Sequence, residues 1–446
     1  MHHEAAVFAA RRQRVCDVLT TRGAAIFLSG HEAVRSNDTE HPFRASSDVL
    51  YLTGFEEPET VVVLAPGHEA GPLVMFVRPR DKEKETWMGR RAGVEGVVAR
   101  YGANTAYTLD ELDEKLPGLL EGTETLHLRF GADRAFDERV LGWMHKLRYR
   151  KGKPAAAPTI LRDTRDLLHP MRAVKAPEEL ELLRRSCAIT AEAHVAAMRA
   201  CRPGVHEYEL QALIEYVFRA RGATAPSYAT IVGAGINGTI LHYTENCSVI
   251  EASDLVLVDA GAEYRGYAGD ITRTFPASGR FTPAQRAVYE LVLEAEEAAI
   301  AMCTVGTTWE AIHDATVRTL TSGMVDLGLL SGSVDTLIEE EKYKRFFMHK
   351  TGHWLGMDVH DVSPYFEGGE PTRLVPGMVQ TVEPGIYIES GAEDIPREFW
   401  GIGIRIEDDV LTTEAGPEVL TAGCPKSVSA VEALVGMGYR IELPAR

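Results

Sequence analysis

Two aspartates on either side of a predicted turn are the first residues whose spacing indicates chemistry. Residues 255–275 read LVLVDAGAEYRGYAGDITRTF, with an apolar run on each side of Tyr264-Arg265-Gly266, which is typical of a β-hairpin. With Tyr264 and Arg265 as the two-residue loop, Asp259 and Asp270 face each other across the strands. Directly opposed side chains have Cβ atoms ~5 Å apart, where like charges destabilise the pair. Two carboxylates placed in this way need a cation or a shared proton.

Three further residues complete a set that could bind metal. His353 lies in TGHWLGMDVHD, Glu383 ends an apolar run just before Pro384-Gly385, and Glu407 lies in GIRIEDD. Arg405 falls on the same face as Glu407 if that segment is one strand. Taken singly, each residue has a plainer explanation, since Asp near Gly is common in turns, Glu383 could be a solvated strand end and His353 a packed histidine.

Taken together, four carboxylates and one imidazole form a hard, oxygen-rich ligand set. Such a set suits Mn²⁺, Co²⁺ or a similar ion rather than an ion bound by thiolates. Two divalent ions offset four carboxylate charges, and two metals ~3.5–4 Å apart can share a hydroxide. The residues therefore predict a dinuclear hydrolytic centre.

The second half of the chain resembles the pita-bread metallopeptidases, which include methionine aminopeptidase, prolidase, aminopeptidase P and creatinase. The resemblance is carried by VDAGAEYRGYAGDITRTF, TGHWLGMDVHD, TVEPGIY and GIRIEDD, in this order and spacing. It implies two divalent ions per subunit, Mn²⁺ foremost, bound by Asp259, Asp270, His353, Glu383 and Glu407. It also implies that Asp270 and Glu407 bridge the two ions.

The same resemblance implies roles for residues around the metals. His242 (in LHYTEN) and His360 match substrate-binding and catalytic histidines, and Glu383 is expected to pass a proton to the leaving prolyl nitrogen. His349, Tyr387 and Arg405 are expected to line the site for proline and the chain beyond it. Arg405 has a structural alternative, which is to orient a ligand carboxylate.

The first half narrows the resemblance to aminopeptidase P, through HPFRASSDVLYLTGFEEPE (residues 41–59) and Trp87 in ETWMGRRAG. Trp87 is otherwise explained by core or surface packing, or by a role at a neighbouring subunit's site. The implied activity is release of the amino-terminal residue from peptides with proline second, by a hydroxide held between two metals. The alternatives are a prolidase restricted to Xaa-Pro dipeptides and an inactive relative that binds peptides. The relatives imply a homodimer or homotetramer.

The elements that must position these residues fall into two domains. In residues 1–172, short apolar runs such as Ala24–Leu28 and Leu73–Val77 alternate with helical segments, which predicts an α/β domain. In residues 173–446, Pro177-Glu178-Glu179 begins a long helix. There a helix pair followed by strands occurs twice, which suggests an α+β catalytic domain with an internal duplication.

Length and composition agree with this division. A chain of 446 residues corresponds to two or three domains. The 47 basic and 65 acidic residues leave a net charge of −18, which disfavours binding to nucleic acid or anionic membranes. The longest apolar runs are too short to span a bilayer, and the first residues do not form a signal peptide. Six scattered Cys without a CxxC motif predict reduced thiols in a cytoplasmic protein.

Overall fold

The computed structural model describes residues 2–151 and 156–439. It divides into two compact units, Met1–Met171 and Arg172–Arg446. The boundary lies one residue before the one predicted from the sequence. The first unit has 24 basic and 25 acidic residues and the second has 23 and 40, so the second unit carries −17 of the −18 net charge.

The first unit is built on a six-stranded mixed sheet with the order β6-β5-β4-β1-β7-β8. Its strands are β1 (Gly23–Leu28), β4 (Val61–Leu64), β5 (Leu73–Val77), β6 (Thr105–Thr108), β7 (Thr125–His127) and β8 (Ile160–Arg162). Its helices are α1 (His2–Leu19), α2 (Ser47–Thr53), α3 (Lys82–Met88), α4 (Gly93–Tyr101), α5 (Leu112–Leu120) and α6 (Arg134–Arg148), and a short hairpin pairs β2 (Val34–Ser36) with β3 (Thr39–Glu40). The apolar segments thus form the strands of one sheet, which is buried at β1, β4 and β5, and this confirms the predicted α/β class. The helix α7 (Arg165–Ala173) spans the unit boundary.

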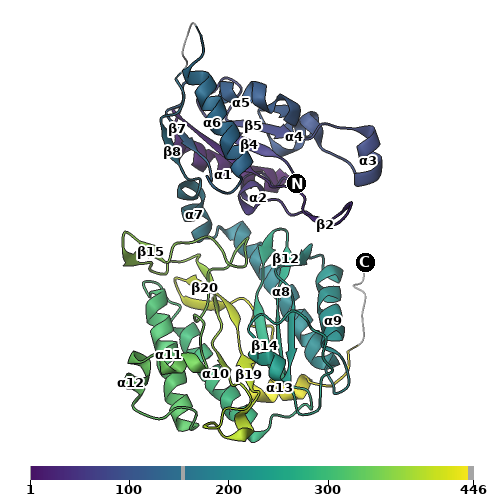
Figure 1. Cartoon of the computed structure of the whole chain (residues 1–446), viewed down its shortest axis with the longest axis vertical. Helices are drawn as coiled ribbons and strands as arrows, with labels where there is room; N and C mark the ends of the chain where they lie inside the picture. Colours follow the sequence, from purple (N-terminus) through teal and green to yellow (C-terminus); the bar gives the residue numbers. More distant parts are fainter. Residues whose placement is uncertain (1, 152–155, 440–446) are drawn as a thin grey trace. The chain divides into compact units, whose positions relative to one another are not determined.

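The helices of the second unit form two pairs (Figure 1). They are α8 (Pro177–Ala200) with α9 (Glu207–Ala220), and α10 (Pro283–Ala301) with α11 (Trp309–Asp326), followed by the shorter α12 (Val334–Glu339) and α13 (Val428–Leu434). The helix α8 begins at Pro177, where the fixed φ of proline suits a first helical turn. In Figure 1 the two pairs lie on opposite sides of the strands of this unit.

Two three-stranded antiparallel sheets carry most of the predicted site. One contains β10 (Ile231–Ala234), β11 (Leu255–Ala260) and β14 (Ile271–Pro276), and the other β17 (Val379–Val382), β20 (Asp408–Thr413) and β21 (Gly416–Val419). Short strands complete the unit: β9 (Ala225–Pro226), β12 (Ala262–Tyr264), β13 (Tyr267–Ala268), β15 (Phe366–Glu367), β16 (Glu370–Pro371), β18 (Gly385–Tyr387) and β19 (Gly403–Arg405). A helix pair followed by a three-stranded sheet therefore occurs twice, as the sequence pattern suggested.

The predicted register of the first hairpin is wrong by one residue on each strand. The turn is at Arg265-Gly266, both with positive φ (50° and 80°), so that Tyr264 pairs with Tyr267. Two consecutive positive φ values are typical of the tight turns whose twist matches that of the strands. As a result Asp259 pairs with Thr272, and Asp270 precedes β14 instead of facing Asp259 in the ladder.

Within the described part of the chain, no helix combines the length and the apolar character that crossing a membrane requires.

Candidate metal centre

The five predicted ligands come from the ends of strands and from one loop of the second unit. Asp259 lies in β11, Asp270 directly precedes β14, and Glu383 directly follows β17. Glu407 lies between β19 and β20, so the expectation that one strand carries both Arg405 and Glu407 is wrong. His353 lies in the coil that bonds to β17, where its backbone nitrogen donates to the Thr381 hydroxyl at 3.0 Å. Because regular strand structure ends at or near these positions, the side chains can converge.

The ligand atoms of Asp270, His353 and Glu407 all lie within 4.8 Å of one another. The Nε2 atom of His353 is 3.4 Å from Asp270 Oδ2 and 3.6 Å from Glu383 Oε1. Its Nδ1 atom is 3.0 Å from the carbonyl oxygen of Trp354, which identifies Nδ1 as the donor. Nε2 then faces the carboxylates, and it would give up its proton on binding a metal ion, as a metal-binding imidazole does.

The electrostatics of the cluster also suit a cation. Burial raises the pKa of Glu383 to about 7, against the lowering effects of His353 and Arg405. Burial raises the pKa of Glu407 well above its usual value, and the charges of Asp270 and Glu383 add to this effect. Burial alone would lower the pKa of His353, but the hydrogen bond to Asp270 and the charge of Glu383 raise it to about 9. Crowded carboxylates that hold protons near neutral pH are the groups that divalent ions stabilise in the charged form.

Tyr228 connects two of the predicted ligands and was missed in the sequence. Its hydroxyl lies 2.5 Å from Asp259 Oδ1 and also contacts Asp270 Oδ1. Burial, together with the charges of Asp259 and Asp270, raises the pKa of Tyr228 well above its usual value, so the hydroxyl remains a donor. No spacing relates this tyrosine to the metal motifs, since it precedes a different strand, β10. Only the folded chain brings it to the carboxylates.

Arg405 extends the cluster toward two predicted substrate-binding residues. Its guanidinium donates to Asp259 Oδ2 at 2.6 Å and to the Tyr387 hydroxyl at 2.8 Å. The Tyr387 hydroxyl also lies 2.9 Å from His349 Nε2. Burial and the nearby Arg405 charge lower the pKa of His349 to about 3, so this imidazole is neutral. The structure thus gives Arg405 contacts that fit both of its predicted roles.

The other two histidines differ from His349 in exposure. His360 is exposed, and its ring packs edge-on against His353 with 4.4 Å between ring centroids. His242 is also exposed. Burial is the main cause of the lowered pKa of His349 and of His360, and the charge of His242 contributes at both. The charge of His242 therefore acts on both of the other histidines.

A buried ionic layer supports the ligands from behind. Arg273 donates to the backbone carbonyls of Glu407 at 2.6 Å and Cys424 at 2.8 Å, and to Asp408 Oδ1 at 2.7 Å. Lys426 joins the other Asp408 oxygen at 2.7 Å. These contacts fix the backbone at Glu407 and Asp408.

A second contact of this kind fixes Asp270. Its backbone N–H donates to Asp409 Oδ2 at 2.9 Å, and the Cys187 thiol donates to the same oxygen at 3.2 Å. Burial is the main cause that raises the pKa of this thiol well above its usual value. Cys187 is therefore a neutral hydrogen-bond donor here and not a thiolate ligand.

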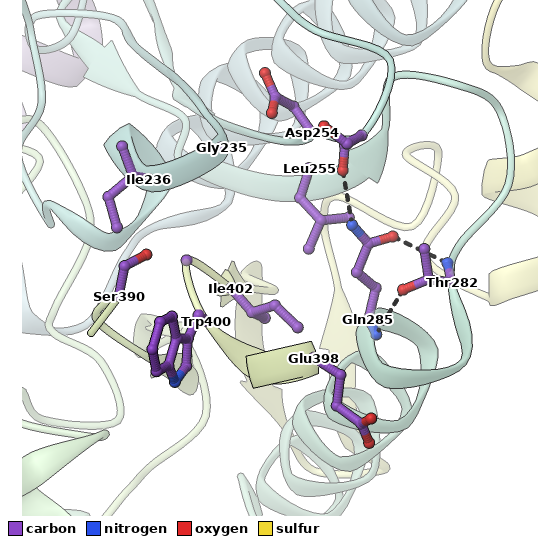
Figure 2. A pocket seen from close by; sticks show the side chains of 12 residues that line it. Gly235, Ile236, Asp254, Leu255, Thr282, Gln285, Ser390, Glu398, Trp400 and Ile402 are labelled. Carbon is purple, nitrogen blue, oxygen red and sulfur yellow. Dashed lines mark hydrogen bonds between the residues drawn. The ribbon is translucent and has the colours of Figure 1, made fainter. Parts of the chain in front are cut away.

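Two other features are not part of the cluster. A pocket of about 350 Å³ is lined by Leu255, Gln285, Trp400 and neighbours, none of which is a predicted site residue (Figure 2). Trp87 in α3 is 82% exposed, so the packing of this side chain in a core is wrong.

Comparison with protein families matches two segments of the chain. Residues 181–414 match metallopeptidase family M24, and residues 8–128 match the aminopeptidase P amino-terminal domain. The first match contains all five predicted ligands.

Individual relatives cover nearly the whole chain. The Xaa-Pro aminopeptidase of Escherichia coli (strain K12) is 45% identical over 430 residues, 96% of this chain and 97% of that protein. The aminopeptidase PepP of Pseudomonas aeruginosa has a solved structure with 47% identity and a TM-score of 0.94, covering 96% of this chain and 97% of that chain. A variant of E. coli aminopeptidase P solved in complex with substrate has 44% identity and a TM-score of 0.93, covering 96% and 98%. These matches confirm the predicted fold of both domains.

Proposed function

Because the chain belongs to metallopeptidase family M24 and carries an aminopeptidase P amino-terminal domain, we propose that it removes the amino-terminal residue from peptides with proline in second position. The observation that carries this proposal is the convergence of Asp270, His353 and Glu407 within 4.8 Å. The E. coli relative, a Xaa-Pro aminopeptidase, matches 96% of this chain and favours this activity over that of a prolidase.

The donor set fits two divalent cations, and we propose Mn²⁺. Asp259, Asp270, His353, Glu383 and Glu407 would hold them. Oxygen ligands with a single imidazole match the preference of Mn²⁺. Bound divalent ions supply a hydroxide nucleophile near neutral pH and polarise the scissile carbonyl.

The chain's own residues then bind and orient the peptide. The Arg405 guanidinium and the Tyr387 hydroxyl are hydrogen-bonded at 2.8 Å. They would line the site beside Asp259, where the free amine of the substrate would lie. The exposed imidazoles of His242 and His360 can reach a bound peptide and donate to the carbonyl oxygen as charge develops on it. Glu383 would pass a proton to the prolyl nitrogen, which carries no hydrogen of its own in the peptide bond.

The decisive experiment compares two substrates on protein depleted of metal and then reloaded with Mn²⁺. A Xaa-Pro-Xaa tripeptide should lose its first residue, and the Glu407→Ala variant should show no turnover. Cleavage of a Xaa-Pro dipeptide alone would assign the chain to the prolidases. Two bound ions without cleavage of either peptide would favour an inactive peptide-binding relative.

Homo-oligomer formation and a cytoplasmic location remain predictions from the sequence. Size-exclusion chromatography with light scattering would measure the mass in solution, and a monomer would contradict the expected dimer or tetramer.

A further inference from the structure

The loop that carries His242 has little regular structure of its own. It follows β10 and the short helical turn Gly235–Thr239, and residues 240–247 belong to no helix or strand. The side chains on both sides of His242 point into the protein, because Leu241 and Tyr243 pack in one apolar cluster with Tyr387. The exposed His242 is therefore held between a partly buried neighbour, Leu241, and a buried one, Tyr243.

One buried carboxylate anchors both ends of this loop. Glu207, the first residue of α9, is 0% exposed. It accepts four hydrogen bonds, from Ala234 N (2.8 Å), Asn237 Nδ2 (3.0 Å), the Tyr243 hydroxyl (2.9 Å) and Ser248 N (2.8 Å). Each of these four donors is neutral: Tyr243 lies in the loop, Ser248 directly follows it, and Ala234 and Asn237 lie in the strand end and the helical turn before it.

Helix capping does not explain this arrangement. The backbone N–H of His206 already has an acceptor in Glu209, at 2.8 Å, which forms the capping box of α9. A buried carboxylate costs desolvation energy unless hydrogen bonds satisfy it. The four bonds of Glu207 satisfy it only when the loop adopts this one path, so the carboxylate selects the loop conformation.

We propose that Glu207 is a positioning residue, which acts through Tyr243 and the loop backbone to hold His242 at the substrate. The inference rests on the proposed peptidase function and on the role proposed there for His242. It names a residue outside the metal centre whose effect on the reaction passes through a single imidazole. A misplacement of ~1 Å in such a group can reduce the rate by about 100-fold.

Three variants test the proposal in the Mn²⁺-loaded protein with a Xaa-Pro-Xaa substrate. Glu207→Ala should reduce kcat/KM by about 100-fold. Glu207→Gln, which keeps one acceptor oxygen, and Tyr243→Phe, which loses one donor, should each reduce it by about tenfold. All three should retain the metal content of the unchanged protein. Glu209→Gln, on the same helix, is the matched control and should leave kcat/KM unchanged.

A double-mutant cycle separates positioning from a general loss of structure. If Glu207 acts through His242, then Glu207→Gln should cause no further loss of kcat/KM when it is added to His242→Ala. Losses that multiply in the double variant would overturn the proposal.

The same measurements distinguish failure of the positioning proposal from failure of the proposed peptidase function. An active protein in which His242→Ala leaves kcat and KM unchanged would refute the role of His242 and the positioning proposal with it. Failure of every variant and of the parent to cleave the peptide would refute the proposed function instead. Should Glu207→Ala not fold, the Glu207→Gln and Tyr243→Phe cycles give the same decision.

Discussion

Removal of the Tyr228 hydroxyl should weaken metal binding without removing a ligand. In Tyr228→Phe the ring stays, but Asp259 and Asp270 lose the hydroxyl that contacts both carboxylates. A hydrogen bond to a charged group contributes ~1.5–3 kcal/mol. Since ~1.4 kcal/mol corresponds to tenfold in an equilibrium constant, the dissociation constant for Mn²⁺ should rise about 10- to 100-fold. This range agrees with the usual effect of partners that orient metal ligands.

Titration calorimetry of the metal-free protein with Mn²⁺ at fixed pH measures this change directly. The matched control is Tyr267→Phe, which removes a buried hydroxyl that donates to Glu179 at 3.0 Å and leaves the Tyr228 contacts in place. The control should lose stability but keep its affinity for Mn²⁺. An unchanged dissociation constant in Tyr228→Phe would refute the orienting role. A lower one would mean that the hydroxyl competes with the ions for the same carboxylate oxygens.

Three further predictions follow from the same geometry. In Glu407→Ala, elemental analysis should find fewer than two bound ions and assays no turnover, and two ions at full occupancy would contradict the ligand assignment. The metal-free protein should lose stability as pH rises from 6.5 toward 9, because folding raises the pKa of His353 to about 9 and that of Glu383 to about 7, so the folded state binds more protons than the unfolded state; the lowered pKa of His349 has the opposite effect only below pH 6.5. Thermal unfolding across this range measures the slope, and a metal-free protein that becomes more stable from pH 6.5 toward 9 would show that the sign is wrong. Arg405→Met should destabilise the metal-free protein by about 3–5 kcal/mol, because it leaves Asp259 buried and unpaired; bound Mn²⁺ should reduce this cost, and an equal loss in calorimetry with and without metal would contradict that.

The sequence predicted which carboxylates and which histidine converge better than it predicted the contacts that hold them. The candidate ligands can be identified from residue type together with local signals, such as the position of Glu383 at a strand end before Pro384-Gly385. The hairpin register was missed because Tyr264-Arg265-Gly266 contains one glycine for two positions with positive φ, and an arginine fills the other. A shift of one residue on each strand preserves the apolar pattern of the pair, so hydrophobicity alone does not choose between the two registers.

The supporting residues could not be predicted, for a different physical reason. Tyr228 and Glu207 act through contacts between segments far apart in sequence, and neither belongs to a periodic pattern or a short motif. Cys187 likewise lies in the middle of α8, where its spacing indicates only a buried helix face. Such residues become visible only when the tertiary structure gives them partners.

The ionic layer behind Glu407 has a consequence for biosynthesis. Arg273 is tied to carbonyl groups of residues 424 and 425, and Lys426 joins Asp408, so the support of the ligands spans more than 150 positions of the chain. Chains emerge from the ribosome amino terminus first, and domains fold as units. A nascent polypeptide therefore cannot assemble the supported carboxylate cluster until translation has passed residue 426, and a divalent ion of this site can be captured only after that point.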